Sequence, residues 1–174
     1  MKFLGAFKGE DVKHLSARGQ RWLKAIHIFF AAIWVGAGVS LLMMQGFLSA
    51  TDGKMLYGVD VSMKFVDDFI IIPGAFGSLL SGLAYSLFTP WGFFRHRWVT
   101  VKWIINVGGI LFGTYWLGPW LNSMPPISGD LGLAALQDPT YTHNKAMSLC
   151  FGPIQVGSLV LAVFLSTLKP WKKR

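Results

Sequence analysis

The chain has 174 residues, of which 53% are hydrophobic and only 14% are charged. This balance excludes an ordinary soluble domain and indicates an integral membrane protein. The net charge of +8 would suggest a nucleic-acid partner in a soluble chain, but the basic residues here stand at the ends of apolar runs, so we expect no nucleic-acid binding. A single cysteine, Cys150, excludes an internal disulfide and any site within one chain that needs several cysteines.

Four apolar stretches are long enough to cross a bilayer core, which needs about 20 residues per helix. We expect these spans at 22–48, 68–89, 98–121 and 147–168. The predicted fold class is all-α: a multi-pass membrane protein whose single domain, residues 1–174, is a four-transmembrane-helix bundle. The first apolar run and the leader before it are too long for a cleaved signal peptide.

Basic residues precede the first span, join the second to the third, and follow the fourth, so all three basic clusters fall on one side of the membrane. The two opposite loops, 49–67 and 122–146, contain three lysines and most of the aspartates. By the positive-inside rule both termini face the cytoplasm, and the expected location is the bacterial inner membrane. The outer loop 122–146 is either a passive connector or a lid on the membrane surface.

Each span carries small residues at intervals of four, as in Ala32, Gly36 and Ser40 of the first and Gly74, Ser78, Gly82 and Ser86 of the second. Such seams let helix backbones approach closely in lipid and predict a tight bundle. The same glycines would also clear room for a flat ligand such as a porphyrin. A seam left uncovered in the bundle would argue for a homo-oligomer.

The strongest functional clue is His27, one to two turns inside the first span. An ionisable side chain in a lipid-spanning segment usually faces the bundle interior and marks a functional site. A neutral imidazole can ligate haem iron or another metal, or move a proton near neutral pH. The alternative is that His27 hydrogen-bonds a neighbouring helix and only fixes the packing.

Lys102 and Asn106 share one stripe of the third span, at about the depth of His27. We therefore expect a site between the first and third spans, open toward the cytoplasm, that contains these three residues. Lys102 either snorkels to the interface or binds an anion such as a porphyrin carboxylate. His96, on the same side, is a solvated interfacial residue or a second axial ligand, whereas His143 lies on the opposite side of the membrane.

Two segments carry a family resemblance. Residues 22–28, Trp-Leu-Lys-Ala-Ile-His-Ile, followed by Ala-Ile-Trp-Val-Gly-Ala-Gly at 32–38, resemble the first helix of the HemJ-type membrane protoporphyrinogen oxidases and of the CopD copper-resistance membrane domain. Residues 97–102, Arg-Trp-Val-Thr-Val-Lys, are similar to the start of a later helix in that group. Over nearly the whole chain, including 91–98, the layout looks like that of uncharacterised bacterial four-helix membrane proteins.

The HemJ resemblance implies haem b or porphyrin contact near His27 and Lys102, with His27 as the metal ligand. It also implies oxidoreductase chemistry coupled to a membrane electron acceptor such as a quinone. The CopD resemblance implies copper handling, but the outer methionines, Met43, Met44, Met55, Met63, Met124 and Met147, do not form a tight cluster in the sequence.

The leading hypothesis from the sequence is a membrane protein that binds haem b or a porphyrin through His27 and acts in redox chemistry. Two alternatives stay open: a non-enzymatic membrane module for assembly or small-ligand binding, and a copper- or metal-handling protein.

Overall fold

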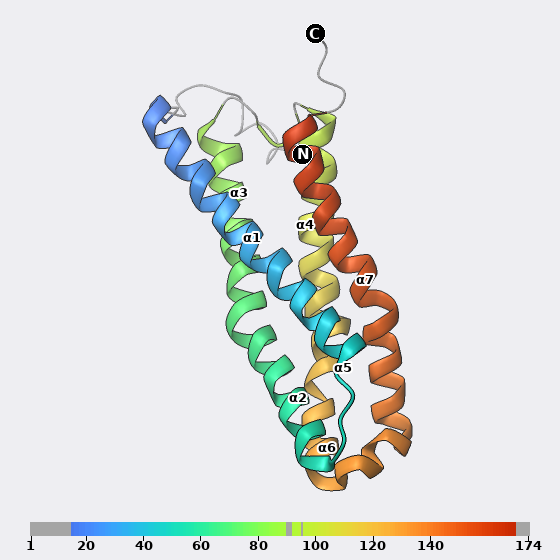
Figure 1. The fold of residues 1–174 in the computed structure, drawn as a ribbon. Helices are drawn as coiled ribbons and strands as arrows, with labels where there is room; N and C mark the ends of the chain where they lie inside the picture. The colour runs from blue at the N-terminus through green and yellow to red at the C-terminus, as the bar shows by residue number, and fades with distance from the viewer. Residues whose placement is uncertain (1–14, 90–91, 95, 170–174) are drawn as a thin grey trace, which may run out of the picture.

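A computed structural model describes residues 15–89, 92–94 and 96–169, and this part of the chain is helical with short connections (Figure 1). Four helical rods run alongside one another. The α-helices are α1 (Ala17–Phe47), α2 (Gly53–Val66), α3 (Ile72–Phe88), α4 (Arg97–Phe112), α5 (Gly118–Asn122), α6 (Met124–Leu131) and α7 (Pro139–Leu168). We call the end with the start of α1 and the end of α7 the basic end, and the end with α6 the outer end.

Three rods are long and apolar enough to cross a membrane: Ala17–Phe47, Gly53–Phe88 and Pro139–Leu168. The described part of the chain is therefore all-helical, and its long apolar helices indicate a membrane protein. The rod that starts with α4 is the fourth predicted crossing, and that crossing stays a prediction because α4 itself has 16 residues. Residues 1–14 and 170–174 lie outside the described residues, so the cytoplasmic placement of both termini also stays a prediction.

Two of the rods contain a π-helical turn. η2 (Asp67–Ile71) joins α2 to α3, and η3 (Gly113–Leu117) joins α4 to α5. Each π turn is followed at once by a helix with proline in its first two positions, Pro73 and Pro119. A proline lacks the N–H that would continue an α-helical ladder, and a π turn is one way for a helix to continue through such a break.

The helices extend beyond the predicted spans at several ends. α1 begins at Ala17 rather than 22, because the Ser16 side chain accepts a hydrogen bond from Gly19 N and caps the helix. The segment 49–67 was expected to be a loop but is mostly α2, capped by Asp52, whose carboxylate accepts from Met55 N at 2.9 Å. α2 then continues through η2 into α3, the second predicted span.

The outer loop expected at 122–146 is also mostly helical. It contains α6, a 3-10 turn η4 (Gly132–Gln137) and the start of α7, which begins at Pro139 instead of 147 because Asp138 caps it. The rod predicted at 98–121 continues through α5 into α6. Polar residues on one face of these outer helices lower their mean hydropathy, which is why they read as loops. The segment forms packed helices, and its role as a lid on the membrane surface or as a passive connector stays a prediction.

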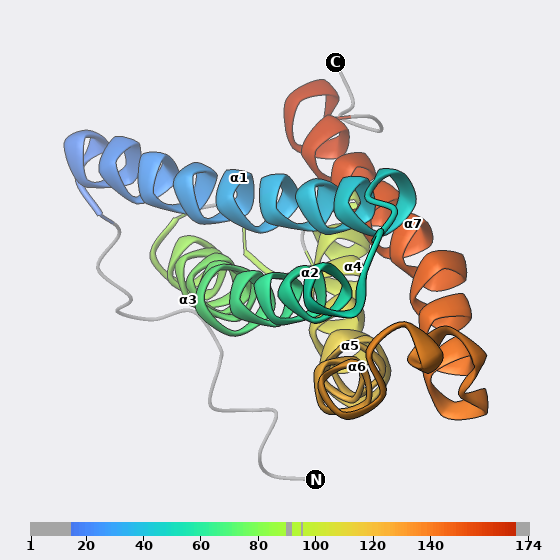
Figure 2. The ribbon, with the colours of Figure 1, turned by 60° about the horizontal axis from the view of Figure 1, so that its bottom comes forward.

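α1 packs chiefly along α3, and Figure 2 shows the far end of α1 lying beside α7. The small residues of α3 make this possible: Gly77 lies under the Phe30 ring, and a Cβ on Gly74 would lie 3.2 Å from the backbone nitrogen of Trp34. Toward α7, a Cβ on Gly38 would lie 2.9 Å from Val156 Cγ2.

The seam predicted on the first span faces the wrong way. Ala32, Gly36 and Ser40 are exposed, and the buried side of α1 carries Trp34 and Ala37. The large side chains of α1 fit onto the small residues of α3, so only one partner of this helix pair needs a small-residue seam.

Candidate functional site

His27 is fixed on α1 by hydrogen bonds to α3. Its Nδ1 lies 3.1 Å from the carbonyl oxygen of Ser78 and 3.0 Å from Ser81 Oγ. A carbonyl oxygen can only accept a hydrogen bond, so Nδ1 carries the hydrogen. In the neutral ring this leaves a lone pair on Nε2, and no hydrogen bond involving Nε2 is found among the described residues.

The local sequence of α3 creates this acceptor pair. Ser78 and Ser81 are three residues apart and therefore lie on one face of the helix. Ser81 Oγ donates to the carbonyl oxygen of Gly77 at 2.5 Å, so its lone pairs are available to the His27 N–H. The next position is Gly82, where a Cβ would lie 3.3 Å from His27 Cε1. A small residue at this position thus leaves room for the imidazole.

Asn106 reaches the same serine from α4. Its Nδ2 donates to Ser78 Oγ over 3.4 Å, while its Oδ1 is buried and has no hydrogen-bond partner in the described part of the chain. Ser78 thereby connects His27, through its carbonyl group, with Asn106, through its hydroxyl group. The sequence placed these two residues between the first and third spans. In the structure the second span stands between them and supplies both serines. The sequence analysis noted Ser78 only as a small seam residue and did not single out Ser81.

Lys102 lies one turn nearer the basic end than Asn106. Its ammonium nitrogen is 5.3 Å from the centroid of the Trp98 ring, in a cation–π arrangement. Its charge acts electrostatically on His27. His96, the remaining predicted site residue, stacks on the same Trp98 ring, with ring centroids 6.1 Å apart.

No hydrogen bond or ring contact joins His27 to His96 among the described residues. The structure therefore does not bring these two predicted site residues into direct contact. His143 is exposed, as expected from the sequence. Gln155 on α7 packs against Gly109 on α4, where an added Cβ would lie 2.6 Å from Gln155 Nε2.

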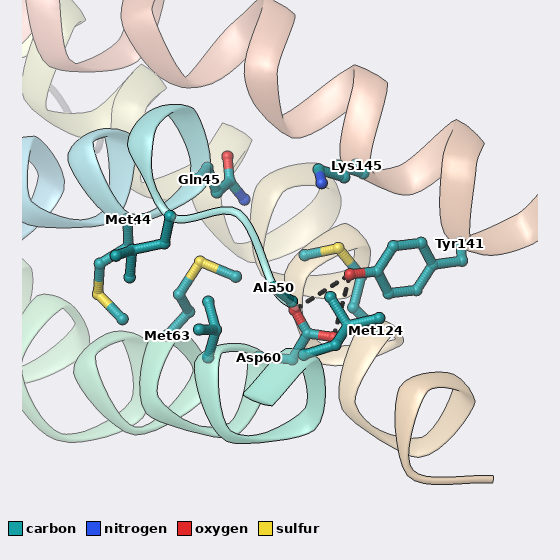
Figure 3. Close-up of a pocket in the computed structure, with 11 residues that line it drawn as sticks. Met44, Gln45, Ala50, Asp60, Met63, Met124, Tyr141 and Lys145 are labelled. Carbon is teal, nitrogen blue, oxygen red and sulfur yellow. Dashed lines mark hydrogen bonds between the residues drawn. The ribbon is translucent and has the colours of Figure 1, made fainter. Parts of the chain in front are cut away.

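A second polar group was missed in the sequence because it lies where loops were expected. Asp60 on α2 is 2% exposed, Tyr141 on α7 is 1% exposed, and the tyrosine hydroxyl lies 3.2 Å from Asp60 Oδ2. A cavity of about 20 Å³ lies beside them, and Lys145 and Gln45 also line it (Figure 3). A cavity of this size holds about one water molecule.

Three methionines that are distant in the sequence, Met44, Met63 and Met124, also line this cavity. Figure 3 shows their sulfur atoms spread along the cavity instead of pointing at one position. Met63 and Met124 belong to the buried core of the outer end, which also contains Leu56 and Leu121. The arrangement is that of packing residues.

The described residues contain no group of three or more His, Cys, Asp or Glu side chains that could hold a metal ion. Comparisons with family models, curated proteins and solved structures find no match to this chain.

Proposed function

We propose that this membrane protein binds haem b or a related porphyrin through Nε2 of His27, in the half of the bundle nearest the basic end. The observation that carries the proposal is the hydrogen bond from His27 Nδ1 to the Ser78 carbonyl oxygen, at 3.1 Å. This bond selects the tautomer whose Nε2 can act as a ligand. Metal-ligating histidines commonly donate their other ring N–H to a carbonyl or carboxylate group in this way.

The donor set suits a porphyrin better than a bare metal ion. A bare ion needs three or four protein ligands, whereas a porphyrin supplies four nitrogens and needs one or two from the protein. His27 is the one histidine of the described chain that is held inside a span with a ring nitrogen free. Ser78 and Ser81 fix the plane of its ring, and the hydrogen bond to Ser78 raises its basicity as a ligand.

When bound, haem would supply a one-electron couple suited to exchange with a membrane acceptor such as a quinone. The role of the chain would be to hold the iron ligand in one tautomer and to keep water away with the apolar helix faces around it. Oxidation of a particular substrate requires further groups, and none is assigned.

The test is the absorption spectrum of protein purified from haem-replete cells. The wild type should show a Soret band that responds to reduction, and His27→Ala should lose it. His143→Ala is the matched control, because His143 is an exposed histidine at the outer end and should leave the band unchanged. Colourless wild-type protein that also fails to take up added haemin would overturn the proposal.

The same geometry favours a second candidate, a non-enzymatic membrane module in which His27 and Asn106 lock three helices together through Ser78. For this module, His27→Ala lowers thermal stability in detergent and no pigment is present in either protein. Copper handling has weaker support, because the methionine sulfurs do not converge. It would require that Met44→Leu and Met63→Leu together change copper sensitivity in cells.

A further inference from the structure

We propose that the cavity beside Asp60 binds one ordered water molecule, through which the ammonium group of Lys145 forms a water-mediated ion pair with the Asp60 carboxylate. The site lies at the outer end and is lined by residues of α1, α2 and α7. The inference is independent of haem binding at His27.

The Asp60 carboxylate is a buried charge whose direct partners are neutral. Asp60 is 2% exposed, and the hydroxyl groups of Tyr141 and Ser128 donate hydrogen bonds to it. A carboxylate can accept about four hydrogen bonds, and a buried carboxylate normally has a positive partner as well. The two hydroxyl groups therefore leave part of the accepting capacity, and the negative charge itself, without a partner.

Lys145 supplies a positive charge from the same face of α7 as Tyr141, because the two residues are four positions apart on the helix. The charge of Lys145 acts electrostatically on Asp60. The two groups are nevertheless too far apart for a direct ion pair, since the one ion pair of the described residues joins Lys64 to Asp68. A polar interaction across such a gap is a common place for a bridging water molecule.

The cavity lies between these groups. Its volume of about 20 Å³ is enough for one water molecule, and its polar lining comes from Asp60, Tyr141, Lys145 and Gln45. Figure 3 shows the Lys145 and Gln45 side chains across from the Asp60 carboxylate. The side-chain amide of Gln45 has no hydrogen-bond partner among the residues that the structure describes. Apolar cavities in proteins stay dry, whereas a cavity with several polar partners holds water.

A water molecule fits these partners better than a metal ion does. It can accept a hydrogen bond from the Lys145 ammonium group while it donates one hydrogen to Asp60, and its second hydrogen remains for Gln45 Oε1. A sodium ion in the same cavity would lie close to the ammonium group and be repelled by it. The water bridge joins Gln45, near the end of α1, to Asp60 of α2 and Lys145 of α7, so it holds three helices together at one point.

The experiment is X-ray radiolysis footprinting of the full chain in detergent. Radiation converts a bound water molecule into a hydroxyl radical in place, so the side chains around that water are oxidised even when bulk solvent cannot reach them. We expect Tyr141, which is 1% exposed, to be oxidised severalfold faster than Trp34, which is 5% exposed in the other core cluster. Tyrosine is no more reactive than tryptophan toward this radical, so the difference would report the water. Equal, slow oxidation of the two residues would show a dry cavity and overturn the proposal.

Lys145→Met tests the role of the ammonium group, because it replaces the donor by an apolar side chain of similar length. We expect the oxidation of Tyr141 to fall to the rate of Trp34. Lys54→Met makes the same change at an exposed lysine outside the cavity and should leave Tyr141 as reactive as in the wild type. Unchanged oxidation of Tyr141 in Lys145→Met would mean that Lys145 does not hold the water, and the proposed ion pair would be wrong.

Two further measurements cover the remaining outcomes. If sodium chloride raises the melting temperature of the wild type above that in choline chloride, and Asp60→Asn abolishes the difference, the cavity binds sodium and the proposal is wrong. Should Lys145→Met fail to fold, NMR of ¹⁵N-lysine-labelled wild type decides the matter. The ammonium hydrogens of Lys145 should exchange with solvent more slowly than those of exposed Lys54, and equal exchange rates would count against the bridge.

Discussion

The hydroxyl of Tyr141 on α7 lies 3.2 and 3.3 Å from the two carboxylate oxygens of Asp60 on α2, and both side chains are almost completely buried. The tyrosine thus offers one hydroxyl hydrogen to both oxygens of the carboxylate, which could accept several hydrogen bonds. The contact joins the outer parts of two helices that are 81 positions apart in the sequence. It makes Asp60 the natural place to test the packing of the outer end.

Tyr141→Phe should lower the free energy of unfolding by about 1–3 kcal/mol, because it removes the tyrosine donor from the buried Asp60 side chain. Denaturant unfolding in detergent measures the change. Tyr57→Phe is the control, since Tyr57 is 46% exposed and its loss of a hydroxyl group should change stability by less than about 0.5 kcal/mol. Equal unfolding midpoints for wild type and Tyr141→Phe would show that the Asp60 contact contributes nothing.

Gly77→Ala should destabilise the pair α1–α3, because the added methyl group would overlap the Phe30 ring. The expected loss is about 1–3 kcal/mol, typical of overpacking in a filled core. Gly36→Ala makes the same chemical change on α1 where no atom lies within 4 Å, and it should be neutral or slightly stabilising. Thermal melts of both variants in the same detergent give the comparison. Similar melting temperatures for the two variants would contradict the packing described for α1 and α3.

The ring of His27 should populate the tautomer with hydrogen on Nδ1, because the Ser78 carbonyl oxygen accepts from that nitrogen. ¹⁵N NMR of histidine-labelled, haem-free protein distinguishes protonated from unprotonated ring nitrogens. His27→Ala assigns the signals, and exposed His143 should show the averaged signal of a ring in water. A protonated Nε2 in neutral His27 would remove the structural basis for iron binding, whether or not pigment is found.

Cys150 on α7 is exposed in the isolated chain and lies within the predicted span 147–168, so we expect it to face lipid. A membrane-impermeant maleimide should therefore leave Cys150 unlabelled in intact membranes. The comparison is His143→Cys in a Cys150→Ala background, which should react from the non-cytoplasmic side because residue 143 is exposed at the outer end. Rapid labelling of Cys150 would place this part of α7 in water.

Apolar length predicted the helices that are long and apolar enough to cross a membrane, because burial in lipid demands a long uninterrupted apolar run. It did not predict α2, α6 or the start of α7. Those segments extend beyond the apolar spans. One face of these helices contributes to the outer core, as Leu56 does on α2 and Met124 on α6, and the other face tolerates polar residues. The caps Asp52 and Asp138 were the local signals that could have revealed them.

The candidate site was predictable in part. The cost of an ionisable group in lipid pointed to His27, and helical spacing placed Lys102 and Asn106 on one stripe. The hydrogen-bond partners Ser78 and Ser81 could not be found this way, because a single sequence does not reveal which helices are neighbours. The spacing of these two serines fits a packing seam as well as it fits an acceptor pair.

The π turn η2 sets the directions in which the continuous helical rod α2–η2–α3 points its side chains at its two ends. A π turn holds one residue more than an α-helical turn, so side chains before and after it are out of phase by about 100° relative to an unbroken helix. On one side of η2 the rod directs Asp60 and Met63 into the outer core, and on the other it directs Ser78 and Ser81 toward His27. Removing one residue from Asp67–Ile71 would restore the phase and turn one of these two faces away from its partners. The length of this short segment therefore sets the rotational register between the two ends of the molecule.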